Sequence, residues 1–247
     1  MSPLIVIPAR MASTRLPGKP LADLNGAPMI VRVCQVADAS GVGRVAVAAA
    51  EPEIVDAVRN AGHEAVLTDP DLPSGSDRVH AALQHLDPDG RHNIVVNLQG
   101  DMPTLPPRVL REVIAPLGRP DGADIATLVC RIEDDDERDD PNVVKAVVSL
   151  APGATSGRAL YFTRATAPWG DGPLYHHVGV YAYRRAALDR FVRAPQSALE
   201  SRERLEQLRA LELGLRIDAV EIPGPPPNGV DTPADLADAR RILALTP

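Results

Sequence analysis

Residues Leu4–Pro20 read L-I-V-I-P-A-R-M-A-S-T-R-L-P-G-K-P. The apolar run Leu4–Ile7 predicts a buried strand, and Pro8 ends that run. The loop that follows carries three cations: Arg10, Arg15 and Lys19. In open α/β sheets, ligands bind outside the carboxyl ends of the strands, where this loop would lie. The stretch therefore predicts a strand that leads into an anion-binding loop, although three cations also fit an ordinary solvated loop.

The composition bounds the class of protein. A chain of 247 residues can bury a full core, as one large domain or two small ones. Its formal net charge of −7 argues against a general nucleic-acid binder and against a binder of anionic membranes. Cys34 and Cys130 lie in apolar runs without metal-site spacing. No apolar run approaches 18 residues and no leader pattern opens the chain, so we expect a soluble, cytoplasmic protein.

Strands and helices alternate after the basic loop. We expect helices near Pro28–Ala37 and Glu51–Asn60, and strands near Val45–Ala48 and Ala65–Leu67. This β-α-β-α-β order predicts a parallel sheet with helices on both faces. With no linker or repeat, we expect one compact α/β domain over residues 1–247.

Three later segments carry further expectations. The stretch Glu133–Asp140 is mostly acidic, and a solvated loop is the favoured interpretation over a metal site. One helix is expected over Ala198–Leu213, and a last helix over Ala234–Leu243. Thr232 is the expected N-cap of that last helix.

Two carboxylates are candidate metal ligands. Asp101 directly follows the predicted strand Asn93–Leu98, and Asp231 precedes the last helix. Magnesium in proteins uses one or two carboxylates together with substrate phosphates. The alternatives are an Asx turn at Asp101 and a helix cap at Asp231.

Other local patterns are weaker. Gly18-Lys19 is not a Walker A motif, because Ser13 and Pro20 stand where that motif requires Gly and Ser or Thr. Ser74-Gly75-Ser76 precedes a helix and could present backbone N–H groups to an anion, with Arg78 nearby, or could be a plain helix cap. The adjacent His176-His177 would point to opposite faces of a strand, so a shared metal is not expected.

Taken together, an ordered set of motifs resembles the 3-deoxy-manno-octulosonate (Kdo) cytidylyltransferase family, also called CMP-Kdo synthetases. The resemblance covers nearly the whole chain. Its N-terminal motifs are I-P-A-R-x-x-S-T-R-L-P-G-K-P at Ile7–Pro20, S-G-S-D-R at Ser74–Arg78 and V-N-L-Q-G-D at Val96–Asp101. Its later motifs are P-N-V-V-K at Pro141–Lys145, Y-F-T-R-A-T-A-P-W at Tyr161–Trp169, H-V-G-V-Y-A-Y-R at His177–Arg184, L-E-Q-L-R at Leu205–Arg209 and G-V-D-T-P at Gly229–Pro233.

The resemblance implies a Rossmann-like nucleotide-diphospho-sugar transferase fold, an α/β fold with a mixed, mostly parallel sheet and helices on both faces. It implies the Mg²⁺-dependent reaction CTP + Kdo → CMP-Kdo + diphosphate, used in lipopolysaccharide biosynthesis. A homodimer is also implied, with residues of about 150–185 as a sugar-site and dimerisation subregion and Ala159–Tyr183 as the candidate interface.

The resemblance also assigns residues to roles. The residues implied to surround the nucleotide are Pro8, Ala9, Arg10, Arg15, Lys19, Ser74, Arg78 and Gln99. Asp101 and Asp231 would hold the metal, and together with Lys19 they form the implied catalytic set. The implied sugar-binding residues are Arg164, His177, Tyr181, Glu206 and Gln207, with Arg164 as a natural partner for a carboxylate.

We hypothesise that Lys19 and Mg²⁺ stabilise charge on the α,β-phosphates, while Asp231 or Asp101 helps to deprotonate the attacking hydroxyl. Two positions depart from the family pattern. Met102 replaces the usual acidic residue after Q-G-D, and Ala48-Ala49-Ala50, followed by Glu51, replaces A-T-D. These departures leave open a related acidic sugar, such as 8-amino-Kdo or sialic acid. A non-catalytic nucleotide-binding regulator is the alternative from another class.

Overall fold

The computed structural model describes residues 2–119, 122–227 and 229–245. The chain forms two compact units: unit 1 is Met1–Arg111 with Pro227–Pro247, and unit 2 is Glu112–Pro226. The expectation of one domain over 1–247 stays a prediction, and its two end residues lie outside the described part. No helix in the described part is long and apolar enough to cross a membrane.

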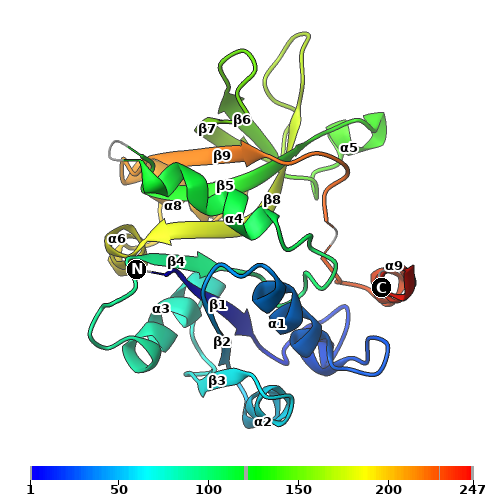
Figure 1. Ribbon diagram of the computed structural model, residues 1–247. Coiled ribbons are helices and arrows are strands. Elements are labelled where there is room, and N and C mark those ends of the chain that lie inside the picture. Colours follow the sequence, from blue (N-terminus) through cyan, green and yellow to red (C-terminus); the bar gives the residue numbers. More distant parts are fainter. Residues whose placement is uncertain (1, 120–121, 228, 246–247) are drawn as a thin grey trace. The chain divides into compact units, whose positions relative to one another are not determined.

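Unit 1 contains a parallel sheet with the strand order β3-β2-β1-β4 (Figure 1). Its strands are β1 (Leu4–Ala9), β2 (Arg44–Ala49), β3 (Glu64–Leu67) and β4 (Ile94–Asn97). Residues Leu4–Ile7 are fully buried. An unbroken apolar run, instead of an alternating one, is what a strand covered on both faces requires. The parallel sheet that the sequence predicted is therefore present in this unit.

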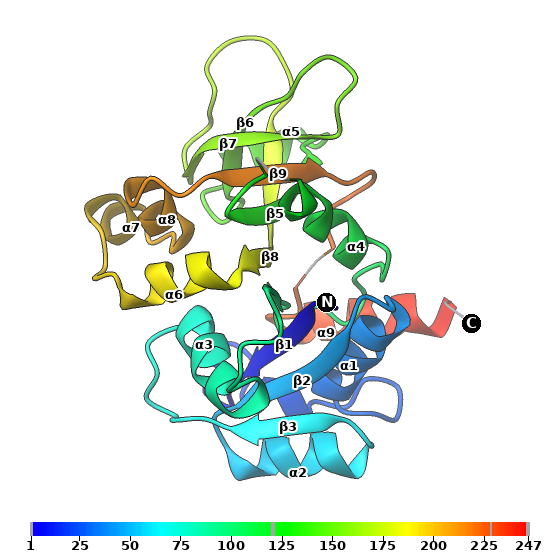
Figure 2. The same ribbon diagram turned by 60° about the vertical axis from the view of Figure 1, so that its left-hand side comes forward.

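Helices cover this sheet. Helix α1 (Met29–Ala39) packs on β1 and β2, α2 (Pro52–Asn60) packs beside it, and α3 (Gly75–Leu86) covers the sheet from its other face (Figures 1 and 2). A short 3₁₀ helix, η1 (Lys19–Leu21), ends the basic loop. Helix α4 (Val109–Ile114) follows the sheet, and η2 (Ala115–Gly118) continues it.

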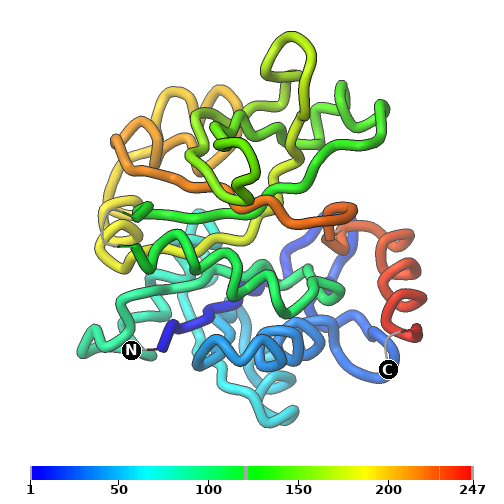
Figure 3. Tube along the Cα trace, turned by 45° about the horizontal axis from the view of Figure 1, so that its top comes forward, coloured from blue at the N-terminus to red at the C-terminus, as the bar shows by residue number. Residues whose placement is uncertain are grey.

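The C-terminal helix α9 (Pro233–Leu245) belongs to unit 1, although it is the last element of the chain. Figures 1 and 3 show it in red beside the blue loop that leads into α1. Its buried residues pack in one apolar cluster with the start of α1: Leu24, Met29, Val230, Leu236 and Ala239. This packing returns the residues just before α9 to the ends of the unit 1 strands.

Unit 2 is built differently. Its strands are β5 (Ile125–Arg131), β6 (Lys145–Ser149), β7 (Ser156–Thr163), β8 (Tyr175–Arg184) and β9 (Ile217–Glu221). They run in the order β8-β5-β9-β7-β6, and β6 pairs again with β8, so the five strands close into a ring. Among the pairings of its described residues, β5–β9 alone is parallel. The expected mixed sheet is present, and its parallel part is concentrated in unit 1.

Two local expectations in unit 2 need correction. The single helix expected over Ala198–Leu213 is wrong: α7 (Ala198–Glu203) and α8 (Gln207–Glu212) are separated at Arg204, which adopts φ 57°. A left-handed residue cannot continue a right-handed helix. The acidic stretch Glu133–Asp140 is solvated as expected, but it contains a one-turn helix, α5 (Asp135–Asp139), instead of loop alone. Helix α6 (Arg185–Arg193) precedes α7 along the chain.

Candidate active site

The basic loop, residues Arg10–Lys19, leaves the carboxyl end of β1 and closes at η1. Gly18 adopts φ 68°, a left-handed conformation that costs glycine little. The Lys19 amide then donates to the Leu16 carbonyl at 3.1 Å, and Pro20 is buried behind it. The turn therefore fixes the backbone of Lys19 and leaves its side chain to reach back toward the sheet.

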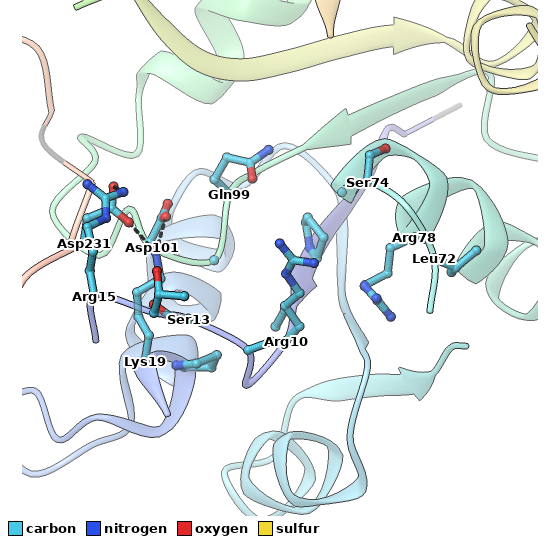
Figure 4. A pocket seen from close by; sticks show the side chains of 17 residues that line it. Arg10, Ser13, Arg15, Lys19, Leu72, Ser74, Arg78, Gln99, Asp101 and Asp231 are labelled. Atoms are coloured by element: carbon cyan, nitrogen blue, oxygen red, sulfur yellow. Dashed lines mark hydrogen bonds and ion pairs between the residues drawn. The ribbon is translucent and has the colours of Figure 1, made fainter. Parts of the chain in front are cut away.

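Lys19 bridges the two candidate metal ligands. Its Nζ donates to Asp101 Oδ2 at 2.7 Å and to Asp231 Oδ1 at 2.9 Å (Figure 4). Arg15 forms an ion pair with the other oxygen of Asp231 at 2.8 Å. These four residues, Arg15, Lys19, Asp101 and Asp231, are called the Lys19 cluster below. Two carboxylates that are 130 residues apart in sequence thus converge on one ammonium group.

The electrostatics of the cluster keep Lys19 charged. Burial alone would lower the pKa of the Lys19 ammonium, but the charges and hydrogen bonds of Asp101 and Asp231 outweigh burial and raise the pKa above its usual value. The side chain of Lys19 is 16% exposed, whereas those of Asp231 and Arg15 are 40% and 64% exposed. The cluster is therefore a charged group at the mouth of a cavity, open to a ligand.

The position of Asp231 depends on the start of α9. The Asp235 carboxylate accepts hydrogen bonds from the Asp231 and Thr232 amides, and the Thr232 hydroxyl accepts one from the Asp235 amide at 3.2 Å. This reciprocal cap confirms Thr232 as the N-cap. The amide of Val230 also donates to the Asp101 carbonyl at 2.8 Å. The cap and this bond together place both carboxylates next to Lys19.

Gly100 allows β1 and the segment after β4 to approach closely. A Cβ at this position would lie 2.9 Å from the Pro8 carbonyl oxygen and 3.3 Å from Ile30. Only glycine fits such an approach without backbone displacement. Gln99 and Asp101 flank it, and the Gln99 amide nitrogen donates to Asn97 Oδ1 at 3.2 Å. Sequence reasoning did not identify Gly100, and its place between two polar site residues was the available signal.

A cavity of about 410 Å³ lies above these strand ends. It is lined by every residue that the sequence placed at the nucleotide or the metal: Pro8, Ala9, Arg10, Arg15, Lys19, Ser74, Arg78, Gln99, Asp101 and Asp231. Its four cations and two carboxylates leave a local charge of +2 in a chain of net charge −7. A polar, positively charged cleft at the carboxyl ends of parallel strands suits a polyphosphate.

The far end of the cavity is held by α3 and by the segment before it (Figure 4). Ser74 is the N-cap of α3, and its hydroxyl accepts from the Asp77 amide at 3.1 Å. Arg78 is almost fully buried and donates to the Thr68 hydroxyl at 2.6 Å and to the carbonyls of Asp69 and Pro70. The Arg78 guanidinium therefore holds the wall of the cavity. Burial lowers its pKa, and the nearby Glu51 opposes that shift.

Arg10 is the contrasting cation. Its side chain is exposed, and within the described residues it makes no hydrogen bond or ion pair. It lies between the Lys19 cluster and Arg78 in Figure 4. It is therefore available to an incoming anion.

The two departures from the family pattern occupy buried positions. Met102 is 7% exposed, and Ala48, Ala49 and Ala50 are buried at the end of β2. Ala48 and Ala49 pair with Pro8 and Ala9 of β1. The parallel pairing of the two strands therefore continues up to the point where the basic loop begins.

Three of the residues expected at the sugar lie together in unit 2. The ring centroids of His177 and Tyr181 are 5.5 Å apart. His177 Nε2 forms a hydrogen bond with the Thr127 hydroxyl at 2.9 Å. Burial and the nearby His176 lower the pKa of His177 to about 3. Burial raises the pKa of Tyr181 well above its usual value, and the charges of Tyr183 and Glu206 add to that shift. All three thus belong to one region of unit 2.

Arg164 and Gln207 have other surroundings. The Arg164 guanidinium donates to the carbonyls of Glu203 at 3.0 Å and Pro141 at 2.8 Å. Gln207 is buried at the first turn of α8. His176 instead contacts Glu137 at 3.4 Å, so the adjacent histidines face different partners, as expected. The five sugar-site assignments stay predictions.

The residues present fit a magnesium ion through oxygen ligands alone. Within the described residues there is no cluster of three or more His, Cys, Asp or Glu that could hold a metal. Asp101 Oδ2 and Asp231 Oδ1 nevertheless both lie within 3 Å of the same nitrogen atom. Two carboxylate oxygens around one point, with phosphates to complete the shell, match the way Mg²⁺ is held in nucleotide sites.

Comparison with known proteins gives concordant results. Residues 4–217 match the family described as cytidylyltransferase. A 3-deoxy-manno-octulosonate cytidylyltransferase from Parvibaculum lavamentivorans is 64% identical over 98% of this chain and 93% of its own length. The relative of the same name from Paramagnetospirillum magneticum is 59% identical over 98% of each chain. A CMP:2-keto-3-deoxy-manno-octonic acid synthetase solved in complex with CTP superposes with a TM-score of 0.89, at 37% identity and 99% coverage of both chains.

The structural match confirms the nucleotide-diphospho-sugar transferase fold that the motifs implied. The family match runs through parts of both units, and the sequence matches cover nearly the whole chain. This chain belongs to the cytidylyltransferase family.

Proposed function

We propose that this chain transfers a cytidylyl group from CTP to Kdo, yielding CMP-Kdo and diphosphate. The observation that carries the proposal is the cavity of unit 1, in which a cationic loop and two carboxylates converge on Lys19. The relatives named for this activity, at 59–64% identity, support the choice of nucleotide and sugar.

The triphosphate would occupy the positive end of this cavity. Arg10 and Arg15 present guanidinium groups that match phosphate oxygens in geometry, and Lys19 supplies a mobile point charge. When phosphate oxygens become available, Lys19 can exchange its carboxylate partners for them, because its side chain is partly exposed. That exchange frees Asp101 Oδ2 and Asp231 Oδ1 at the moment when the nucleotide arrives.

Mg²⁺ is the cofactor we propose, held by the carboxylates of Asp101 and Asp231. When bound, the ion would supply charge neutralisation next to the phosphates. The support is the donor set: two acidic oxygens from two loops that are fixed by the α9 cap and by the Val230–Asp101 hydrogen bond.

The reaction is an in-line displacement at the α-phosphorus. The anomeric oxygen of Kdo forms a bond to the α-phosphorus, and the bond from that phosphorus to the α,β-bridging oxygen breaks, with release of diphosphate. The hydroxyl proton passes to the carboxylate of Asp101 or Asp231. Lys19 remains an ammonium, because the anionic phosphate oxygens that would replace its carboxylate partners also favour its charged form, and it stabilises the charge that develops on the leaving group. In such transfers the protein mainly positions groups and neutralises charge.

The sugar would be recognised by the unit 2 residues. His177, Tyr181 and Glu206 provide a neutral imidazole, a neutral phenol and a carboxylate in one region. Arg164 would bind the sugar carboxylate by exchanging one of its two backbone carbonyls for it. Gln207 completes the proposed set.

Three broader statements from the sequence are also proposals: lipopolysaccharide biosynthesis as the pathway, the cytoplasm as the location, and a homodimer as the assembly. The expected interface segment Ala159–Tyr183 contains Trp169, 99% exposed, and Leu160, 54% exposed. Large exposed apolar side chains in one segment support a protein contact there. Light scattering on the purified protein would measure the assembly.

The test of the activity is diphosphate release, with Kdo, 8-amino-Kdo or sialic acid offered against each of the four nucleoside triphosphates, with and without Mg²⁺. We expect turnover with CTP, Kdo and Mg²⁺ together. Turnover with another acidic sugar and not with Kdo would show that this other sugar is the substrate. Tight CTP binding without turnover on any sugar would favour a nucleotide-binding regulator.

The metal assignment has its own test. Asp101→Ala removes one of the two proposed ligands and one partner of Lys19. We expect turnover at saturating Mg²⁺ to fall by roughly 10²-fold or more. Near-normal turnover of this variant would show that Asp101 does not hold the metal.

A further inference from the structure

Glu51 was not among the residues that the sequence assigned to the site. It is the last residue before α2, and its Oε2 accepts a hydrogen bond from the Met11 amide at 2.9 Å. Met11 is the second residue of the basic loop and follows Arg10. The contact joins segments 40 residues apart.

This hydrogen bond extends the pairing of β1 with β2. The two strands pair in parallel as far as Ala9 and Ala49, and the Ala50 amide donates to the Ala9 carbonyl at 2.9 Å. Beyond that bond β2 turns into α2, so no backbone acceptor from β2 follows. The Glu51 carboxylate supplies the next acceptor from a side chain.

The position of Glu51 is itself fixed. Its carbonyl accepts from the Ile54 and Val55 amides at the first turn of α2, and Pro52 occupies the first helical position. Ile54 is fully buried, and its packing holds this turn against the rest of unit 1. A carboxylate on such a fixed turn can hold the start of the basic loop in place.

The rest of the loop is tied down farther along. The Leu16 amide donates to the Ser13 hydroxyl at 3.4 Å, and the Lys19 amide donates to the Leu16 carbonyl. The bond from Met11 to Glu51 therefore holds the Arg10 end, while η1 and the Lys19 cluster hold the other end.

We propose that Glu51 is a positioning residue for CTP, which holds the start of the basic loop so that Arg10 faces the triphosphate. Glu51 acts through its hydrogen bond to Met11 and does not itself touch the nucleotide. Ala50 carries no carboxylate, and Glu51 supplies one from the next position. The inference rests on the proposed use of CTP.

The test compares Glu51→Ala with Glu51→Gln, which keeps an oxygen acceptor for the Met11 amide and removes the charge. For Glu51→Ala we expect the KM for CTP and the dissociation constant of CTP to rise about tenfold, or about 1.4 kcal/mol. The KM for Kdo and kcat should stay within about threefold, because η1 still holds Lys19. Glu51→Gln should bind CTP within about threefold of the unchanged protein.

A second readout needs no turnover. In the ligand-free protein, hydrogen exchange at the Met11 amide should be faster in Glu51→Ala and close to unchanged in Glu51→Gln. Glu53→Ala is the matched control, because it removes an exposed carboxylate from the same turn of α2 and should alter neither CTP binding nor Met11 exchange.

Several outcomes would overturn the proposal. Unchanged CTP affinity in Glu51→Ala would show that the loop does not need this tether. Equal loss in Glu51→Gln and Glu51→Ala would assign the effect to charge. If Glu51→Ala does not fold, Glu51→Asp, which withdraws the carboxylate by one methylene, replaces it and should show the same CTP-specific loss. Absence of CTP turnover in the unchanged protein would instead contradict the proposed function.

Discussion

The cavity of unit 1 and the strand ring of unit 2 each contain a lysine, and the two lysines have different kinds of partner. In the cavity, Lys19 is bound by two partly exposed carboxylates. In the ring, Lys145 is fully buried, and its ammonium donates to the carbonyls of Asp140 at 2.6 Å and Val143 at 2.9 Å. The carboxylates around Lys19 can be exchanged for phosphate oxygens of a ligand. The backbone carbonyls around Lys145 cannot leave, so Lys145 belongs to the architecture.

The cause of this difference is topology. Parallel strands end together at one edge of a sheet, so the loops after β1 and β4 meet in solvent and bring polar side chains together. A ring of mainly antiparallel strands has no such edge, and side chains of its strands, such as Phe162 and His177, pack on one another with their ring centroids 5.0 Å apart. We therefore expect substitutions in the cavity to affect chemistry first, and substitutions at fully buried ring positions such as Lys145 to affect stability first.

The largest effect that tests this difference between the two regions is expected when the Lys19 ammonium is removed. Lys19→Met keeps the length of the side chain and deletes the ammonium, so turnover should fall by roughly 10²- to 10³-fold. The melting temperature should change little, because the ion pairs of Lys19 with Asp101 and Asp231 are partly solvated. Steady-state kinetics and thermal unfolding measure both quantities.

Arg15→Met is the control for that experiment. Arg15 contacts the same Asp231 but is 64% exposed, so we expect a much smaller loss of turnover.

Sugar binding should be almost unaffected in Lys19→Met. A variant that binds Kdo far more weakly but still turns over would contradict the role of Lys19.

The opposite result is expected for Lys145. Lys145→Met leaves two carbonyls without their buried donor, which should lower the free energy of unfolding by about 1–3 kcal/mol. The KM for CTP should stay unchanged. Chemical denaturation and CTP titration test this pair of expectations, and a loss of CTP affinity without a loss of stability would remove the distinction between the two regions.

A smaller effect concerns pH. Burial holds the pKa of folded His177 near 3, whereas an unfolded histidine titrates near 6.5. Between these values the unfolded chain binds a proton that the folded chain does not, so stability falls as the pH falls from about 6.5 toward 3. Near pH 5 this group should contribute a slope of at most about 1.4 kcal/mol per pH unit.

Denaturation of His177→Phe at several pH values would measure that contribution, since the substitution keeps an aromatic ring and removes the titrating group. An unchanged slope would show that His177 does not titrate on unfolding. An NMR titration of the histidine ring in the unchanged protein gives the same quantity if the variant is unstable.

Sequence reasoning was most successful where chemistry and local pattern coincide. The unbroken apolar run Leu4–Ile7, the loop with Arg10, Arg15 and Lys19 that follows it, and a carboxylate after a strong strand all follow from local rules. The convergence of Asp101 and Asp231 on Lys19 is a tertiary fact. It depends on α9 returning to unit 1, which no periodicity in the chain reveals.

Two features escaped because their signals are weak. Glu51 is one acidic residue before a helix, and only the structure shows that its side chain reaches Met11. The break between α7 and α8 occurs at Arg204 without Gly or Pro to mark it. In unit 2 the closure of the ring, through pairing of Lys145 with His176, joins strands that are separated by an intervening hairpin strand.

The most direct test of the central claim is a crystal structure with CTP and Mn²⁺, an anomalous scatterer that takes the place of Mg²⁺. We expect a metal ion about 2.0–2.2 Å from oxygens of both Asp101 and Asp231, with Lys19 Nζ moved onto phosphate oxygens. A structure in which Lys19 still bridges the two carboxylates, with the metal bound elsewhere, would contradict it.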